Sequence, residues 1–425
     1  MVRADALEIV VVNDRGFPGG GASKVALKSA VGLAKLGHRV SVFAAMGPVA
    51  PELTEAGVDV RILGQEDLAG GGRLQMAAQG LWNVHAAKEL AHLLAGKRKG
   101  RTVVHVHSWS KALSASIFAA SAHSGHPVVA TLHDYGFVCP NAALHDFPEG
   151  SACRRVPMSA SCITRNCDAR AYGHKLWRVS RQIALKNFAK AEDAISAAIC
   201  VTDYSRSIMR PLLPARIEMV VVPNPIDVLD LGPATPETSR NFTYIGRFSR
   251  EKGVLIAAEA AQLAGVPLTL VGDGELRSHV VSIAPTAIVT GWLPAEQVAA
   301  AIRASRAVIV PSLWRETQGM VVPEALSAGV PVIAATVTAP AAAILPGVDG
   351  LLFENGNAGA LADALKRLAT DDSLVRALGL AAYQRYWAAP ATSDRHLSEL
   401  EALYKRTIAK TGRLGQSETA PSSTF

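Results

Sequence analysis

Aromatic residues and long apolar runs are both scarce in this sequence. Phe, Trp and Tyr together make up 5% of its 425 residues, whereas hydrophobic residues as a whole make up 49%. Ala, Val and Leu therefore supply most of the apolar surface, as expected for strands and helices packed in layers. No window of about eighteen apolar residues occurs, so no membrane-spanning helix is predicted. At this length and composition we expect a globular chain with two hydrophobic cores.

Motifs that would indicate several other protein classes are also absent. No glycine-rich turn continues into Gly-Lys-Ser or Gly-Lys-Thr, as in a Walker loop, and none has the Gly-x-Gly-x-x-Gly spacing of a dinucleotide-binding turn. No Asp-x-Asp pattern is present to hold a divalent cation against a diphosphate. The first residues lead into a short strand pattern at 9–12 without the apolar stretch of a signal peptide, so a cytoplasmic location is expected.

Positive charge is in excess, with a formal net charge of +7. Basic residues cluster at 97–101 and again over 165–190, the latter overlapping a helix predicted over 171–191. Nucleic acid, anionic lipid and a phosphorylated substrate would each attract such segments, and an ordinary solvated helix face explains them equally well. We expect no nucleic-acid partner. Peripheral contact with an anionic membrane, at its inner face, is the alternative to a solvated face.

Strand-like and helix-like patterns alternate in both halves of the chain. Short apolar runs predict strands at 8–13, 39–44, 58–63, 102–107, 127–132, 197–202 and 217–222, and again at 242–245, 268–271, 307–310, 331–335 and 350–353. This alternation predicts the α/β class, with two Rossmann-like, doubly wound parallel-sheet domains that face each other across a cleft.

A Pro-rich segment that begins at Pro223 is typical of a linker between domains. We therefore expect a first domain over 1–222 and a second over 223–385. The helix predicted over 386–411 is expected to pack back on the first domain. The segment 412–425 is rich in Ser and Thr and is expected to be disordered.

Glycines and histidines mark the candidate ligand site of the first domain. Gly20 and Gly21 join a strand to a helix, and such a turn forms either an anion site or a plain tight turn. His105 and His107 are two residues apart on one strand and therefore face the same way. His133 follows the next strand. Ligands of doubly wound sheets bind at the carboxyl ends of strands, so His133 is a candidate ligand residue, with a polar strand end as the alternative.

Four of the five cysteines lie in an irregular segment, 136–168: they are Cys139, Cys153, Cys162 and Cys167. Irregular segments of this length are uncommon unless they are functional or clamped. A structural zinc ion held by the four thiolates would clamp this one. The spacings lack the Cys-x-x-Cys pairs typical of zinc sites, and free or redox-labile thiols are the alternative.

The most informative stretch consists of an apolar strand, a loop that carries Glu316 and a helix that carries Glu324. Each glutamate either caps the helix or accepts hydrogen bonds from hydroxyl groups of a ligand. Arg247 and Lys252 follow one strand of the same domain, and Gly272 follows another. Two cations beside a glycine turn suit a diphosphate, and carboxylates suit hydroxyl groups. Together these residues predict a site for a nucleotide sugar.

With these motifs the sequence resembles the retaining glycosyltransferases of the GT-B fold, family-4 (group 1) type. The resemblance extends from the glycine turn to about Tyr404, and its motifs are PNPID, YIGRFSREKG, LVGDGE and PSLWRETQGMVVPEALSAGVPV. It implies transfer of a sugar from a UDP-, GDP- or ADP-linked donor to a saccharide or lipid-linked acceptor, in cell-surface or exopolysaccharide biosynthesis. It also implies catalysis that requires no cofactor, by front-face attack with the leaving phosphate as base, and closure of the two domains on the donor.

The resemblance implies roles for individual residues. The catalytic set is Glu316 at the sugar hydroxyls, His133 at the sugar face, and Arg247 and Lys252 at the diphosphate. The rest of the donor site comprises Glu324 at the ribose with Gly20, Gly21, Gly272, Thr317, Gln318, Gly319 and Met320. Gln318 departs from the family, which often has an aromatic residue there. A nucleotide-sugar epimerase of the same fold and a non-catalytic nucleotide-sugar-binding relative are the alternative functions.

Overall fold

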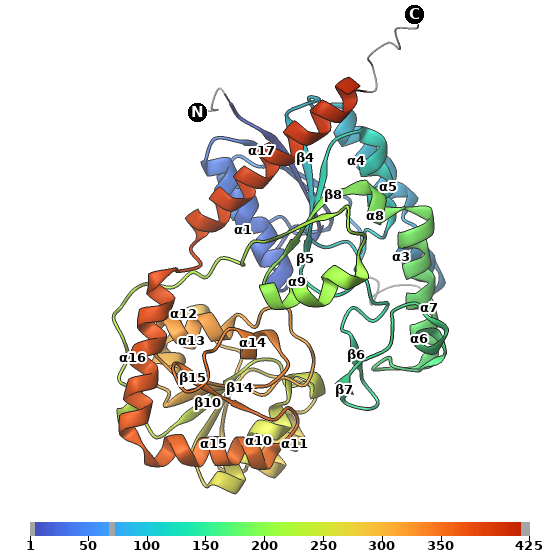
Figure 1. Cartoon of the computed structure of the whole chain (residues 1–425). Helices are drawn as coiled ribbons and strands as arrows, with labels where there is room; N and C mark the ends of the chain where they lie inside the picture. The colour runs from blue at the N-terminus through green and yellow to red at the C-terminus, as the bar shows by residue number, and fades with distance from the viewer. Residues whose placement is uncertain (1–4, 68–72, 418–425) are drawn as a thin grey trace, which may run out of the picture.

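A computed structural model describes residues 5–67 and 73–417 of the chain. It contains two large parallel β-sheets, each with helices on both faces (Figure 1). The first sheet has seven strands in the order β3-β2-β1-β4-β5-β8-β9, and the second has six in the order β12-β11-β10-β13-β14-β15. The predicted fold class, two doubly wound α/β domains, is confirmed.

Short apolar runs form the strands of both sheets. The first sheet comprises β1 (Glu8–Arg15), β2 (Arg39–Met46), β3 (Asp59–Ile62), β4 (Thr102–Val106), β5 (Val128–Leu132), β8 (Ile195–Cys200) and β9 (Glu218–Val221). The second comprises β10 (Phe242–Ile245), β11 (Leu268–Val271), β12 (Ile288–Gly291), β13 (Ala307–Val310), β14 (Val332–Ala335) and β15 (Gly350–Phe353).

Helices cover these sheets. Around the first sheet they are α1 (Gly21–Lys35), α2 (Pro51–Glu55), α3 (Arg73–Leu81), α4 (Val84–Ala95), α5 (Ser116–Ser124), α7 (Tyr172–Ile183), α8 (Ala191–Ala194) and α9 (Asp203–Met209). Around the second they are α10 (Val254–Ala264), α11 (Arg277–Ile283), α12 (Ala295–Arg303), α13 (Val321–Ser327), α14 (Ala339–Ala342), α15 (Ala358–Thr370) and α16 (Asp372–Ala388).

Both faces of the central strands of the first sheet are buried, which is why these strands are largely apolar. Along β1, Val10 and Val12 belong to one hydrophobic core, while Ile9 and Val11 belong to the core on the opposite face. This division follows from the alternation of side chains along a strand. Parallel sheets covered by helices on both sides require apolar residues at every such position.

The last helix, α17 (Ser393–Ser417), returns from the second domain to the first (Figure 1). Leu397, Leu400, Leu403 and Tyr404 of this helix are part of the core that also contains residues of β1 and α1. The helix continues to Ser417 and so enters the segment 412–425, for which we predicted disorder; the remainder of that segment lies outside the described residues.

The segment 136–168 contains little regular structure. A two-stranded antiparallel pair, β6 (His145–Asp146) and β7 (Ser151–Ala152), is followed by the short helix α6 (Ala160–Thr164). Asp146 is buried and accepts hydrogen bonds from Arg155 at 3.1 Å and Arg165 at 2.8 Å. These ion pairs join distant parts of the segment to one another, while Arg178 and Gln182 of α7 contact it from outside, at Asp168 and at the carbonyl oxygen of Phe137.

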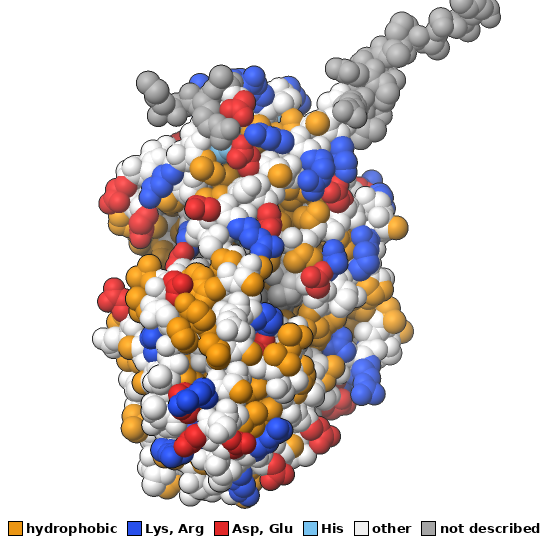
Figure 2. Space-filling view, turned by 60° about the vertical axis from the view of Figure 1, so that its left-hand side comes forward, with side chains coloured by type: hydrophobic (Ala, Val, Ile, Leu, Met, Phe, Trp, Pro, Cys, Tyr) orange, Lys and Arg blue, Asp and Glu red, His pale blue; other side chains and the backbone are white. Residues whose placement is uncertain are grey.

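Acidic and basic side chains are interspersed on the face that Figure 2 shows, without a large patch of one sign. In the described part of the chain, no helix has the combination of length and apolar character that crossing a bilayer requires.

Candidate active site

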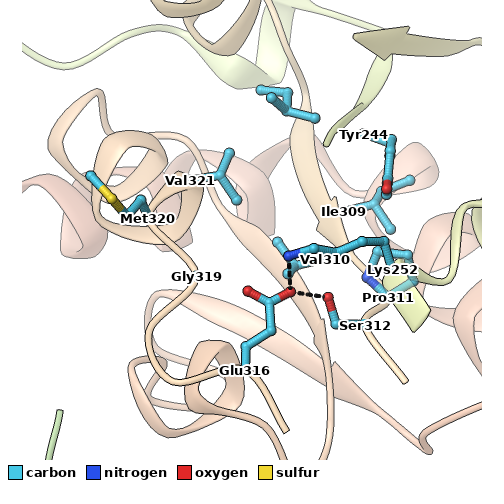
Figure 3. A pocket seen from close by; sticks show the side chains of 11 residues that line it. Tyr244, Lys252, Ile309, Val310, Pro311, Ser312, Glu316, Gly319, Met320 and Val321 are labelled. Atoms are coloured by element: carbon cyan, nitrogen blue, oxygen red, sulfur yellow. Dashed lines mark hydrogen bonds and ion pairs between the residues drawn. The ribbon is translucent and has the colours of Figure 1, made fainter. Parts of the chain in front are cut away.

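A hollow in the second domain lies at the carboxyl ends of β10 and β13, where ligands of doubly wound sheets bind (Figure 3). Its lining includes four of the residues predicted from the sequence: Lys252, Glu316, Gly319 and Met320. The other lining residues are Tyr244, Ile245, Ile309, Val310, Pro311, Ser312 and Val321.

Glu316 and Lys252 form an ion pair inside this hollow. The Lys252 ammonium donates to Glu316 Oε1 at 2.9 Å, and the Ser312 hydroxyl donates to the same oxygen (Figure 3). Burial alone would raise the pKa of Glu316, but Lys252 and Ser312 outweigh burial and hold the pKa below its ordinary value. Glu316 is therefore an ionised acceptor, as required to bind sugar hydroxyl groups. The ammonium also lies 5.4 Å from the ring centroid of Trp314.

Two glycines give the loops around this pair their shape. Gly253, next to Lys252, has φ +71°, and a Cβ there would lie 1.9 Å from the carbonyl oxygen of Pro311. Gly319 has φ +74°, and a Cβ there would lie 2.5 Å from Pro340. Both positions favour glycine for its conformation and for the close approach of a neighbouring loop. Gly253 thus lets the turn with Lys252 approach the segment that leads to Glu316, and Gly319 lets the loop with Glu316 approach α14.

Glu324 lies in the first turn of α13 and does not line the hollow. Burial raises its pKa to about 7, and the nearby Lys24 offsets part of that effect. Lys24 belongs to α1 of the first domain, so the two domains face each other at this carboxylate. At neutral pH Glu324 is therefore divided between an acceptor form and a form that also donates, and either form can bind a diol.

The loop that carries Glu316 is attached to the first domain. Thr317 Oγ1 donates to the carbonyl oxygen of His133 at 2.8 Å, and Thr202 Oγ1 donates to the carbonyl oxygen of Thr317 at 2.6 Å. Asn224 Nδ2 donates to Gln318 Oε1 at 2.5 Å. The resemblance assigned residues 317–320 to the donor, and the structure adds side-chain contacts from this loop to the first domain and to the segment that begins at Pro223. Thr202 was not among the residues predicted from the sequence, and Asn224 was expected to lie in a linker.

Four other predicted residues lie outside the hollow. Arg247 is exposed at the end of β10. At Gly20 or Gly21 a Cβ would meet no atom within 4 Å, so this turn faces open space that a ligand can occupy. Gly272 has a packing role, because a Cβ there would lie 2.0 Å from the carbonyl oxygen of Gly246.

His133 lines a second hollow, in the first domain, together with His107, Ser108 and Asp134. Its Nε2 atom lies 3.0 Å from Nδ1 of His107, and the two rings meet edge to edge, with their planes 25° apart and their centroids 5.3 Å apart. Burial lowers the pKa of His133 to about 3, so its ring is neutral at physiological pH. As predicted, His105 and His107 face the same way, with ring centroids 4.0 Å apart.

The cysteines of the segment 136–168 gather around a buried lysine of α7. The Lys175 ammonium donates to the sulfur of Cys167 at 3.3 Å and of Cys162 at 3.5 Å. Burial alone would lower the pKa of Lys175, but the two sulfurs outweigh it and raise the pKa, so the ammonium keeps its charge. In the described part of the chain, no group of three or more Cys, His, Asp or Glu side chains is arranged to hold a metal ion.

The predicted zinc site therefore has no support from this arrangement. Cys139, Cys153, Cys162 and Cys167 are all free thiols. The cation that faces two of their sulfurs is Lys175, a residue to which our sequence analysis gave no role at the cysteines.

Comparison with known proteins covers both domains. The sequence model described as Glycosyltransferase Family 4 matches residues 19–228, and the model described as Glycosyl transferases group 1 matches residues 239–371. A phosphatidyl-myo-inositol mannosyltransferase of Mycobacterium leprae is 29% identical over 49% of this chain and 60% of that protein. A GDP-mannose-dependent alpha-mannosyltransferase of Mycolicibacterium smegmatis is 34% identical over 38% of this chain and 43% of that protein. Each match thus spans less than two thirds of the relative.

Solved structures match nearly the whole chain. Sucrose-phosphate synthase from Thermosynechococcus elongatus has a TM-score of 0.68 at 18% identity, covering 95% of this chain and 100% of that one. Anabaena HepE in complex with UDP-glucose has a TM-score of 0.62 at 18% identity, covering 95% and 99%. At this identity the likeness shows the fold alone. Together with the two family matches, it places the chain in the family-4, group 1 glycosyltransferases of the GT-B fold.

Proposed function

We propose that this chain transfers a hexose from a nucleoside-diphosphate sugar to a saccharide or lipid-linked acceptor, with retention of configuration at the sugar and without a catalytic metal ion. The observation that carries the proposal is the pair formed by Lys252 and Glu316 at the strand ends of the second domain. An ionised acceptor and a cation at hydrogen-bond distance match the two ends of a sugar–diphosphate bond. When a donor binds, its hydroxyl groups contact Glu316 and its diphosphate contacts Lys252. These two contacts replace the ion pair between Lys252 and Glu316.

The proposed reaction breaks the bond between the anomeric carbon and the diphosphate oxygen. Negative charge then grows on the leaving diphosphate, and Lys252 and Arg247 stabilise it more in the transition state than in the ground state. Glu316 is the carboxylate among the lining residues, and it is already paired with Lys252 and Ser312. A carboxylate held in this way suits binding better than nucleophilic attack. We therefore infer front-face attack by the acceptor hydroxyl, whose proton passes to the leaving diphosphate.

The names of similar proteins support two donors. Curated relatives include GDP-mannose-dependent mannosyltransferases, and HepE was solved with UDP-glucose. The decisive experiment is a screen of nucleotide sugars for release of nucleoside diphosphate, with GDP-mannose and UDP-glucose first. Proton NMR of the product then reports the configuration at the anomeric carbon, and turnover in EDTA reports on metal. An inverted product would overturn the retaining mechanism, and loss of turnover in EDTA would overturn metal independence.

We further propose that the first domain rests on an anionic membrane surface through α7 and the π-helical turn Ala184–Phe188 that follows it. Tyr172, Leu176 and Ile183 are exposed at helical spacing, and Phe188 is 71% exposed. Exposed or half-buried lysines flank these side chains, namely Lys186 and Lys190. Exposed apolar side chains next to cations suit a lipid interface. A lipid-linked acceptor in cell-surface or exopolysaccharide synthesis would then be presented at that surface.

Vesicle sedimentation tests the membrane proposal. We expect binding to vesicles that contain anionic lipid, weaker binding to neutral vesicles, and loss of binding in a variant that combines Leu176→Glu with Phe188→Glu. Leu380→Glu provides the control, because Leu380 is 48% exposed on α16, outside this surface. Equal loss of binding in the control variant would overturn the proposal.

A further inference from the structure

A row of buried polar side chains runs through the first domain from α17 to His133. The hydroxyl of Tyr404 lies 2.5 Å from Nδ1 of His105, and Nε2 of His105 lies 2.7 Å from Thr131 Oγ1. The ring of His105 packs on the ring of His107, with centroids 4.0 Å apart. His107 in turn meets His133 through the contact of 3.0 Å between Nδ1 and Nε2. The row therefore ends at His133, which lines the hollow of the first domain and whose carbonyl oxygen accepts a hydrogen bond from Thr317.

His107 is fixed in place at the end of β4. Its backbone N–H donates to the carbonyl oxygen of Val12 at 2.9 Å, and its ring lies between those of His105 and His133. Its side chain is buried, with 5% of the residue exposed. A ring that is packed against His105 and hydrogen-bonded at its edge to His133 has little freedom to reorient.

The protons on this pair can be assigned from the hydrogen bonds. Burial, followed by the neighbouring histidines, lowers the pKa of His107 well below its ordinary value, so both rings of the pair are neutral. A neutral imidazole carries one N–H and one lone pair, so one ring of the pair donates and the other accepts. The choice depends on Nε2 of His107, which is buried and has no hydrogen-bond partner among the described residues.

A buried N–H without a partner is rarer and more costly than an unused lone pair. The proton of His107 therefore lies on Nδ1, which donates to Nε2 of His133. His133 must then carry its own proton on Nδ1. This atom is the ring nitrogen of His133 that remains for a ligand, and its ring lines the hollow with Ser108 and Asp134.

We propose that His107 is a positioning residue, which fixes His133 as the Nδ1–H tautomer and so makes it a hydrogen-bond donor toward a hydroxyl oxygen of the bound sugar. The role toward sugar rests on the proposed function, whereas the tautomer does not. The hydrogen bond made by one ring nitrogen commonly determines which nitrogen carries the proton. The backbone of His133 is held as well, since its carbonyl oxygen accepts from Thr317. Ring and backbone are thus fixed from opposite sides of the cleft.

Two substitutions of His107 separate positioning from packing. In His107→Asn the side-chain amide can donate from near the position of Nδ1, whereas His107→Leu fills the space without a donor. Tyr404→Phe is the matched control, because it removes the hydrogen bond to His105 and leaves the pair of His107 and His133 intact. Circular dichroism and thermal unfolding establish that each variant is folded.

Long-range proton–nitrogen NMR of the ¹⁵N-histidine-labelled full chain reads the tautomer directly, with His133→Gln to assign the signal. We expect His133 to be the Nδ1–H tautomer in the native protein, in Tyr404→Phe and in His107→Asn. In His107→Leu we expect a mixture of the two tautomers of His133. With the donor found in the screen, kcat should fall about 10- to 100-fold in His107→Leu with little change in KM, and recover in His107→Asn.

Several results would overturn the proposal. They are a proton on Nε2 of His133 in the native protein, an unchanged tautomer in His107→Leu, and equal loss of turnover in the Asn and Leu variants. If His107→Leu does not fold, the native protein and His107→Asn still decide the assignment. If no donor is turned over, the proposed function fails, while the NMR experiment still tests the role of His107.

Discussion

Lys252 Nζ lies 2.9 Å from Glu316 Oε1, so two residues expected to hold different parts of one ligand hold each other in this structure. The side chain of Lys252 is 23% exposed and that of Glu316 is 8% exposed. This burial protects the ion pair from much of the solvent screening that weakens surface ion pairs. Lys252 and Ser312 together hold the pKa of Glu316 below its ordinary value, so the carboxylate and the ammonium form one ion-paired unit.

Replacement of Glu316 should separate binding from transfer. In Glu316→Gln the acceptor for sugar hydroxyl groups is weakened, while the Lys252 ammonium loses its partner and becomes free for phosphate. We expect turnover to fall about 100-fold or more, and nucleoside diphosphate affinity, measured by calorimetry, to be retained or increased. Turnover close to that of the native protein would contradict the assignment.

Arg247 should contribute to diphosphate binding without contributing to the fold, because its side chain is exposed. In Arg247→Ala we expect the free energy of diphosphate binding to weaken by roughly 1.5–3 kcal/mol, as for a lost charge-assisted hydrogen bond, with an unchanged Tm. Arg250→Ala is the control, since Arg250 is also exposed and lies in the adjacent turn. Equal loss of affinity in both variants would indicate a general charge effect and not a contact.

Glu324 should make stability depend on pH. Burial raises its folded pKa to about 7, whereas the ordinary value is 4.5. The folded state therefore binds the Glu324 proton more tightly than the unfolded state does. The free energy that this proton contributes to stability is fully present below pH 4.5 and is lost as the pH rises through about 7. The Tm of Glu324→Gln minus the Tm of the native protein should thus be larger at pH 8 than at pH 5. Thermal unfolding at the two pH values checks this, and a difference independent of pH would count against it.

The cysteine segment should not depend on metal. Because the cation beside Cys162 and Cys167 is the Lys175 ammonium, we expect purified protein to contain well under one zinc ion per chain. Exposure to EDTA should leave the Tm unchanged. A stoichiometry near one, with a lower Tm after chelation, would show that the thiols rearrange around zinc.

Local sequence patterns predicted the strands and the residues at the carboxyl ends of the strands, where ligands bind. This was possible because an apolar run and the residues that follow it are contiguous in the chain. Lys252 and Glu316 were both identified in this way. Their contact with each other was not, since the pair is 64 residues apart and each residue was interpreted by its expected ligand. Gly272 was assigned to the donor, although the close approach of Gly246 accounts for it. Lys175 was regarded as part of a basic helix face, because its burial among thiols depends on tertiary packing.

The contact between Thr317 and His133 could not be predicted from the sequence either, since it joins residues 184 positions apart in different domains. It suggests how the donor loop responds to the first domain. The Thr317 hydroxyl donates to the His133 carbonyl at 2.8 Å, while the Thr317 carbonyl accepts from Thr202 at 2.6 Å. The backbone just after Glu316 is therefore fixed by the domain opposite, and under the proposed function its position relative to the sugar depends on this link.

Thr317→Val removes the hydroxyl with little change in shape, and Thr317→Ser keeps it. Loss of one hydrogen bond of this kind amounts to about 1 kcal/mol, so we expect kcat/KM to fall roughly 5-fold in the Val variant and to stay near the native value in the Ser variant. Nucleoside diphosphate affinity should change little in either, because Lys252 and Arg247 are untouched. Equal impairment in the Ser and Val variants would show that the hydroxyl does not link the domains, and a matching fall in Tm would assign its effect to folding.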